Sequence, residues 1–99
     1  MRAADSWLSV PSSAYSCFSS GSLFVTALYS PPDEAMISTF GATSSDGDVF
    51  VSMVKSWTFN TIEMNLYCIG LAGNSSVITA WVRDDLGRVS STSFPVNIN

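Results

Sequence analysis

The amino-acid sequence predicts an all-β protein, an antiparallel sandwich of about seven to eight strands in a single domain over residues 1–99. Three observations support this prediction. Apolar residues recur at every second position along most of the chain, turn-forming residues follow about every ten residues, and no helical period of useful length is present. A chain of 99 residues is also close to the common size of one domain.

Seven segments have the residue types and the alternation that are typical of strands. They span residues 6–10, 22–30, 35–43, 49–57, 62–69, 77–83 and 90–98. Residues 14–18 are ambiguous, because they either continue the first strand or form an irregular connection. The expected number of strands therefore stays between seven and eight.

Turn-forming residues separate these segments. The Pro-Pro pair at 31–32 ends the strand before it, because proline cannot donate to a ladder. Asp46-Gly47 predicts a hairpin with a type I′ turn, in which both central residues take positive φ. Gly87 suits the left-handed position of a tight final hairpin. Pro95 points outward in the alternation and predicts an edge strand near the end of the chain.

The alternation also assigns the core. The expected inward-facing residues are Ile62, Met64, Leu66 and Cys68, then Ile78, Ala80 and Val82, and finally Phe94, Val96 and Ile98. Residues 49–54 differ from these strands because they are apolar on both faces. A two-layer sandwich hides one face of each strand, so the second apolar face predicts burial against another chain.

Cys17 and Cys68 leave two interpretations open. They form one disulfide, which would close a loop of about fifty residues and stabilise the domain by about 4 kcal/mol, or they are two buried thiols. Two cysteines in a chain without histidine do not make a metal site. We expect neither a metal nor another cofactor.

The charge argues against several classes of partner. The chain has a net charge of −4, and its four cations are Arg2, Lys55, Arg83 and Arg88. A nucleic-acid-binding protein needs a cationic face, and an anionic membrane surface attracts basic segments, so neither partner is expected. No apolar run approaches the roughly 20 residues of a membrane-spanning helix.

The residues do not predict an enzyme. A serine nucleophile needs a base, and without histidine the remaining candidate is Lys55, which directly precedes Ser56 and is not part of a Ser-x-x-Lys arrangement. Glu63 lies on an outward strand position, with no partner carboxylate for glycoside hydrolysis. The acidic residues at 46–48 and 84–85 fit turn formation better than calcium binding.

The chain ends in the segment VITAWVRDDLGRVSSTSFPVNI, which reads as a strand, an acidic–Gly turn and a Ser/Thr-rich strand. An earlier segment is SLFVTALYSPPDEAMISTF. These segments resemble the last hairpin, and the second strand, Pro/Asp connection and third strand, of immunoglobulin-like domains of the bacterial and phage type. The resemblance implies an immunoglobulin-like sandwich for adhesion, display or structure. The antibody pattern is missing, because Cys17 precedes the second strand, Cys68 lies one strand too early and no Trp lies on 35–43.

The sequence thus predicts a protein that acts through its surface. Tryptophan dominates interface hot spots, and an apolar strand face needs a cover. The interface candidates are Trp7, Val49, Phe50, Val51, Trp57 and Trp81. The expected partner is a protein, either a second copy or a larger assembly such as a capsid, and the tryptophans also fit a glycan.

The cellular setting depends on Met1. With Met1 as the natural start and no signal peptide, the hypothesis is a virion surface protein made in the host cytosol, such as a phage capsid decoration or tail-surface subunit. One alternative is an extracellular immunoglobulin-like adhesion module of a bacterial cell-surface protein. Another is a carbohydrate-binding module that uses its tryptophans.

Overall fold

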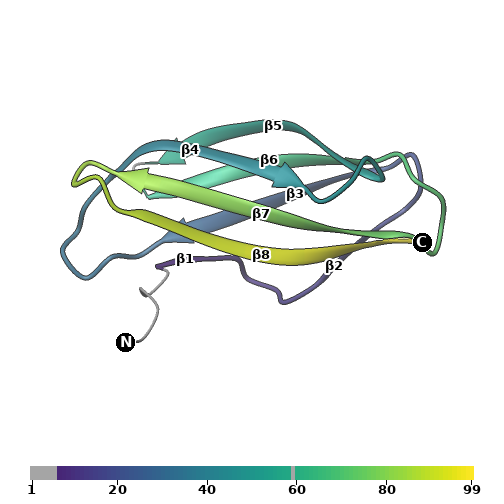
Figure 1. The fold of residues 1–99 in the computed structure, drawn as a ribbon, viewed down its shortest axis with the longest axis horizontal. Coiled ribbons are helices and arrows are strands. Elements are labelled where there is room, and N and C mark those ends of the chain that lie inside the picture. Colours follow the sequence, from purple (N-terminus) through teal and green to yellow (C-terminus); the bar gives the residue numbers. More distant parts are fainter. Residues whose placement is uncertain (1–6, 59) are drawn as a thin grey trace.

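The computed structural model describes residues 7–58 and 60–99, and these form two β-sheets packed face to face (Figure 1). The eight strands of the described residues are β1 (Leu8–Ser9), β2 (Tyr15–Cys17), β3 (Ser22–Tyr29), β4 (Ile37–Ser44), β5 (Val49–Thr58), β6 (Thr61–Cys68), β7 (Ser75–Asp84) and β8 (Val89–Ile98). The predicted all-β sandwich is confirmed. The ambiguous segment 14–18 contains a short strand of its own, β2. No helix of the described residues has the length and apolarity to cross a membrane.

Each sheet has four strands. The first sheet has the order β1-β3-β6-β5 and the second the order β2-β8-β7-β4. All neighbours are antiparallel except β2, which runs parallel to β8. Without β2, this is the strand arrangement of the constant-type immunoglobulin fold, four strands on one sheet and three on the other. The fold is therefore an immunoglobulin-like sandwich.

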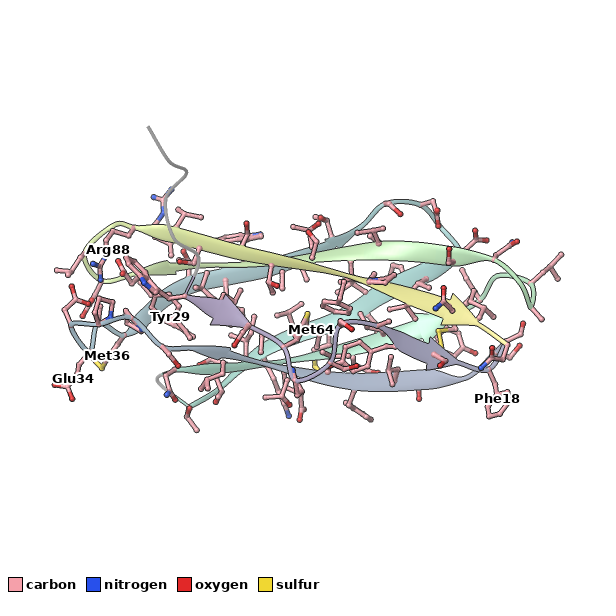
Figure 2. The ribbon with its side chains drawn as sticks, turned by 90° about the horizontal axis from the view of Figure 1, so that it is seen from below. Phe18, Tyr29, Glu34, Met36, Met64 and Arg88 are labelled. Carbon is pink, nitrogen blue, oxygen red and sulfur yellow. A yellow bond between two sulfur atoms is a disulfide. The ribbon has the colours of Figure 1, made fainter. Side chains whose placement is uncertain are left out.

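The core lies between the sheets and follows the predicted alternation. On β6, Ile62, Met64, Leu66 and Cys68 are fully buried, and Met64 lies midway between the two layers in Figure 2. The inward positions of β7 and β8 are buried too, from Ile78, Ala80 and Val82 to Phe94, Val96 and Ile98. One pleat face of each strand thus supplies the apolar burial that holds the layers together.

The Asp46-Gly47 turn does not form the predicted hairpin. The strands on either side of it, β4 and β5, belong to different sheets, so the chain crosses from one layer to the other here. Gly47 does not have the positive φ of a type I′ turn. The Asp46 side chain instead accepts hydrogen bonds from the backbone N–H of Asp48 and from Ser76 Oγ, which fasten the crossing to β7. Gly87, in contrast, has a φ of 85° in the β7–β8 hairpin, as predicted.

Pro95 does not mark an edge strand. Its strand, β8, lies between β2 and β7. The partner β2 pairs with β8 only from Val96 to Ile98, so Pro95 lies just outside that ladder. Its missing N–H therefore costs the sheet no hydrogen bond to β2.

Candidate functional site

The outer face of the first sheet carries large apolar side chains that point away from the core. Phe50 on β5 lies opposite Tyr67 on β6, while Phe24 on β3 and Met53 on β5 flank Asn65. Phe24 is 61% exposed, Phe50 55% and Met53 47%. The exposed apolar face, as we call it, consists of Phe24, Leu28, Phe50, Met53 and Tyr67.

A β-bulge in β5 creates part of this face. The register shifts between Val51, which pairs with Leu66, and Met53, which pairs with Asn65. Ser52 is the extra residue, and its hydroxyl donates a hydrogen bond to the Asn65 carbonyl. In an unbroken strand Met53 would point into the core, because side chains alternate with a period of two. The bulge reverses that alternation, so Met53 points outward and Val54 packs against the core.

The charged residues of β5 and β6 on this outer face form a pair. Lys55 Nζ lies 3.5 Å from Glu63 Oε1, and the two residues are direct neighbours in the register. An exposed pair of this kind contributes little to stability. Its consequence is that this part of the face carries no net charge.

A hollow borders the exposed apolar face at its β1 side. It has a volume of about 280 Å³ and is lined by Ser9, Val10, Pro11, Thr26 and Leu28. Leu28 belongs both to this hollow and to the exposed apolar face. The first sheet therefore presents exposed apolar side chains next to a hollow that has room for an apolar side chain.

A hydrogen-bonded cluster at the β7–β8 end holds the strand ends together. The Tyr29 hydroxyl donates to Asp84 Oδ2 over 2.6 Å, and Arg88 Nε donates to the same oxygen over 2.9 Å. Arg88 Nη2 also donates to Asp33 Oδ1 over 2.7 Å, and the guanidinium lies 4.8 Å from the ring centroid of Trp7. Tyr29 and Arg88 lie together at this end in Figure 2, opposite the end that carries Phe18.

The cluster fixes the charge state of its members. Burial, together with the hydrogen bond to Asp84, raises the pKa of Tyr29 to about 12. For Asp84, burial alone would raise the pKa, but hydrogen bonds from Tyr29, Arg88 and the Leu86 backbone outweigh it and lower the pKa to about 2. Asp84 is thus a buried carboxylate with satisfied acceptors, which is typical of a structural anchor.

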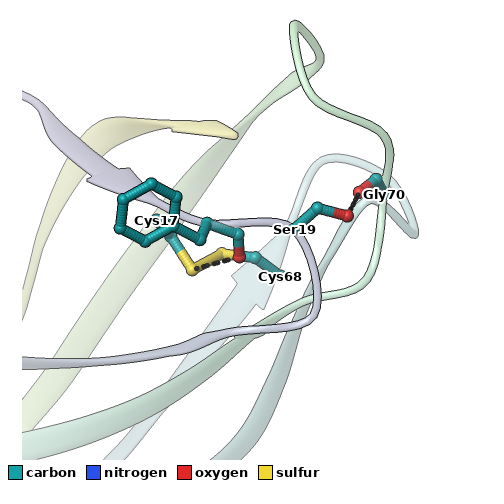
Figure 3. Close-up of a disulfide and its surroundings, with 5 residues drawn as sticks. Cys17, Ser19, Cys68 and Gly70 are labelled. Atoms are coloured by element: carbon teal, nitrogen blue, oxygen red, sulfur yellow. Dashed lines mark hydrogen bonds between the residues drawn. A yellow bond between two sulfur atoms is a disulfide. The ribbon is translucent and has the colours of Figure 1, made fainter. Parts of the chain in front are cut away.

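A disulfide joins the two sheets at the opposite end of the molecule (Figure 3). Cys17 lies on β2 in the second sheet and Cys68 at the end of β6 in the first, with 6.4 Å between their Cα atoms. Nearby, Ser19 Oγ donates to the Gly70 carbonyl over 2.7 Å. Of the two interpretations that the sequence left open, the structure has the disulfide.

The structure does not bring the six predicted interface residues together. Phe50 belongs to the exposed apolar face, but Val51 faces inward and packs against the core. The prediction for Val49 is wrong, because this first residue of β5 is fully buried in its own core, opposite Cys68.

The three tryptophans lie in different places. Trp7 packs partly against the core, and its carbonyl accepts a hydrogen bond from the Ser30 backbone. Trp81 lies on the outer face of the second sheet, away from β5. Trp57 is part of β5, and its side chain lies outside the described residues.

Sequence reasoning missed most of the exposed apolar face. Phe24 and Leu28 alternate with buried residues of β3, and that alternation was visible in the sequence. Tyr67 was visible in the same way on β6. Met53 was not, because only the bulge at Ser52 turns it outward.

The acidic residues are the candidates for binding a metal ion. Within residues 7–58 and 60–99, no group of three or more Cys, Asp or Glu side chains is placed to hold a metal ion. The acidic residues at 46–48 and 84–85 take part in turns: Asp46 accepts from Asp48, and Asp84 Oδ1 accepts from the backbone N–H groups of Leu86 and Arg88. This agrees with the turn interpretation of both pairs.

The comparisons with known proteins concern the fold. No protein-family model matches the chain, and no curated protein matches it. A solved structure of domains 4 and 5 of the S-layer protein SbsC is similar, with a TM-score of 0.68 and 17% sequence identity. The match covers 92% of this chain and 44% of that one, so this chain spans less than half the length of its structural neighbour. At this identity the likeness extends to the β-sandwich fold.

Proposed function

We propose that this protein is a non-catalytic structural module that associates with a second copy of itself through the exposed apolar face. The observation that carries the proposal is a sheet face on which five large apolar side chains, from Phe24 to Tyr67, remain between 42% and 61% exposed. The composition agrees with a non-catalytic role, since the chain has no histidine and few charges.

The size of the face supports association. Large aromatic side chains bury about 150–250 Å² each, so the three aromatic side chains of the face, at about half exposure, offer roughly 300 Å² per copy, to which Leu28 and Met53 add. Apolar patches of a few hundred Å² mark interaction sites. A stable interface needs about 800 Å² per partner, and the polar residues of the same face, such as Thr26 and Glu63, supply the remainder.

The charge distribution favours a second copy as the partner. The chain has a net charge of −4, so two copies repel each other over most of their surfaces. On the first sheet the paired charges of Lys55 and Glu63 cancel. The acidic residues at the ends of the sandwich are Asp33, Glu34, Asp84 and Asp85 at one end and Asp46 and Asp48 at the other. Two copies that meet through the exposed apolar face bring this uncharged part of the first sheet into contact, and the acidic ends lie outside the contact.

For the location we propose a cell surface. Disulfides persist in oxidising compartments and are rare in the cytosol, so the bond between Cys17 and Cys68 favours a surface module over a virion protein made in the host cytosol. The fold likeness to a domain of an S-layer protein supports the same choice. The virion hypothesis stays a prediction without further support.

Sedimentation velocity over a range of concentrations tests the association. We expect the wild-type chain to form dimers, and Phe50→Ser to weaken dimerisation at least about tenfold, because it removes a half-buried aromatic anchor. Val77→Ser is the control: Val77 is 46% exposed and points outward from β7, on the second sheet and so on the opposite side of the sandwich.

Two results would contradict the proposal. One is a wild-type chain that stays monomeric at all concentrations. The other is a loss of dimers in Val77→Ser equal to that in Phe50→Ser, which would point to nonspecific association of exposed apolar residues. Urea unfolding of both variants shows that they remain folded.

A further inference from the structure

The outer face of the second sheet carries a different arrangement, centred on Trp81. Trp81 on β7 lies between Gly41 on β4 and Ser91 on β8 in the register. A Cβ atom built on Gly41 would lie 2.8–2.9 Å from the Nε1, Cε2 and Cζ2 atoms of the indole. The edge of the indole that carries these three atoms therefore occupies the space above Gly41 that a Cβ atom would fill.

Gly41 therefore leaves room for the indole of Trp81. Any larger residue would put its Cβ into the ring and force the indole to tilt. Trp81 is only partly buried, so part of the indole remains accessible to solvent. Within the described chain, the indole N–H of Trp81 makes no hydrogen bond.

Polar groups surround this ring on the same face. The next row of the register holds Thr43, Thr79 and Ser93, and the hydroxyls of Thr79 and Ser93 lie 2.9 Å apart. Arg83 follows Trp81 by two residues on β7, so its side chain is on the same side of the sheet. Arg83 is exposed, and no carboxylate of the described residues pairs with it, whereas Lys55 and Arg88 both have acidic partners.

We propose that this face of the second sheet binds an acidic saccharide. The C–H face of a pyranose ring would pack on the accessible part of the Trp81 indole, as apolar surfaces do on aromatic rings. The Arg83 guanidinium would bind the sugar carboxylate through two parallel hydrogen bonds. The indole N–H and the hydroxyls of Thr79 and Ser93 would bond the ring hydroxyls.

The charge balance makes Arg83 selective. A chain with a net charge of −4 repels anions in general. The unpaired guanidinium of Arg83 makes the surface beside Trp81 attractive to an anion. A protein partner would instead need a wider apolar patch around the tryptophan, and the neighbours of Trp81 in its row are a glycine and a serine. The site lies on the sheet opposite the exposed apolar face, so the proposal goes beyond the self-association and does not depend on it.

The test uses two hexasaccharides as probes, one of galacturonic acid and one of neutral β-1,4-linked glucose. In nitrogen-15 NMR spectra of the full chain, we expect the acidic hexamer to shift the indole N–H signal of Trp81 saturably. By calorimetry the neutral hexamer should bind at least about tenfold more weakly, because it lacks the charge-assisted hydrogen bonds to Arg83.

Variants separate the site from general electrostatics. Arg83→Gln should lower the affinity for the acidic hexamer about tenfold, and Gly41→Ala should lower it by tilting the ring. Lys55→Gln, which removes the same charge from the opposite sheet, should leave it unchanged. Arg83 and Lys55 are exposed, so neither glutamine variant threatens the fold.

Three results would overturn the proposal. They are no saturable binding of the acidic hexamer, equal affinity for the neutral hexamer, and an equal loss of affinity in Lys55→Gln and Arg83→Gln. None of them would affect the self-association, which sedimentation measures in the absence of saccharide.

Discussion

The replacement Asp84→Asn tests the hydrogen-bonded cluster at the β7–β8 end. In the native chain Asp84 Oδ1 accepts from the backbone N–H groups of Leu86 and Arg88, and Oδ2 accepts from Tyr29 and from Arg88 Nε. An asparagine that keeps the two backbone bonds places its NH₂ group where Oδ2 was. Tyr29 can turn its hydroxyl to accept from this group, but Arg88 then faces another donor.

The expected loss follows from these contacts. Removing one partner of a buried ion pair costs about 3–5 kcal/mol when the other charge is left buried. The Arg88 side chain is 33% exposed and keeps its bond to Asp33, so the loss should be smaller. We expect Asp84→Asn to lower the free energy of unfolding by about 2–3 kcal/mol, a large part of the stability of a small domain.

Urea unfolding followed by tryptophan fluorescence measures this loss, with an unchanged slope showing that the same surface unfolds. Asp85→Asn is the control, because Asp85 is an exposed neighbour, and it should change the free energy by less than about 0.5 kcal/mol. A loss in Asp84→Asn that is as small as that of the control would refute the structural role of the cluster.

Three further predictions concern stability. The pKa of Asp84 is lowered from 3.8 to about 2, so its stabilisation is complete above about pH 5 and is lost as the pH falls toward 2. The pKa of Tyr29 is raised from 10.0 to about 12, so its stabilisation is lost as the pH rises from 10 toward 12. The midpoint temperature of thermal unfolding should fall in both of these pH ranges. An Asp84→Asn variant that loses stability at acid pH as much as the native chain would contradict the assignment to Asp84. The double variant Cys17→Ser, Cys68→Ser should lose about 4 kcal/mol in urea unfolding, and a loss below about 1 kcal/mol would show that the bond adds little to the two sheets. Leu66→Ala should cost about 2–5 kcal/mol, because Leu66 is fully buried; a negligible cost would contradict the register of β6.

The sequence predicted well wherever strand alternation decides the structure. The inward set of β6, from Ile62 to Cys68, follows from a period of two alone. The same period separates Phe24 from Val25 and Ala27 on β3, but the alternation does not say which of the two faces is buried. Local turn chemistry was enough at Gly87, since a tight hairpin needs a residue with positive φ.

The failures have non-local causes. Asp46-Gly47 has the local form of a hairpin, but whether two strands join one sheet depends on the whole topology. Met53 turns outward because Ser52 is inserted as a bulge, and an apolar run does not reveal where such an insertion falls. The bond between Tyr29 and Asp84 joins residues 55 positions apart, which the fold alone brings together.

The central claim is that the exposed apolar face is covered when two copies associate. Met53 lies on this face and is 47% exposed, while Met36 lies at the β7–β8 end and is 49% exposed, so the two thioethers should react at similar rates in the isolated chain. Peroxide oxidation followed by mass spectrometry measures both rates in one sample. We predict that at concentrations where dimers form Met53 oxidises several-fold more slowly than Met36, and that dilution removes the difference. Equal rates at every concentration, in a sample that sedimentation shows to be dimeric, would contradict the claim.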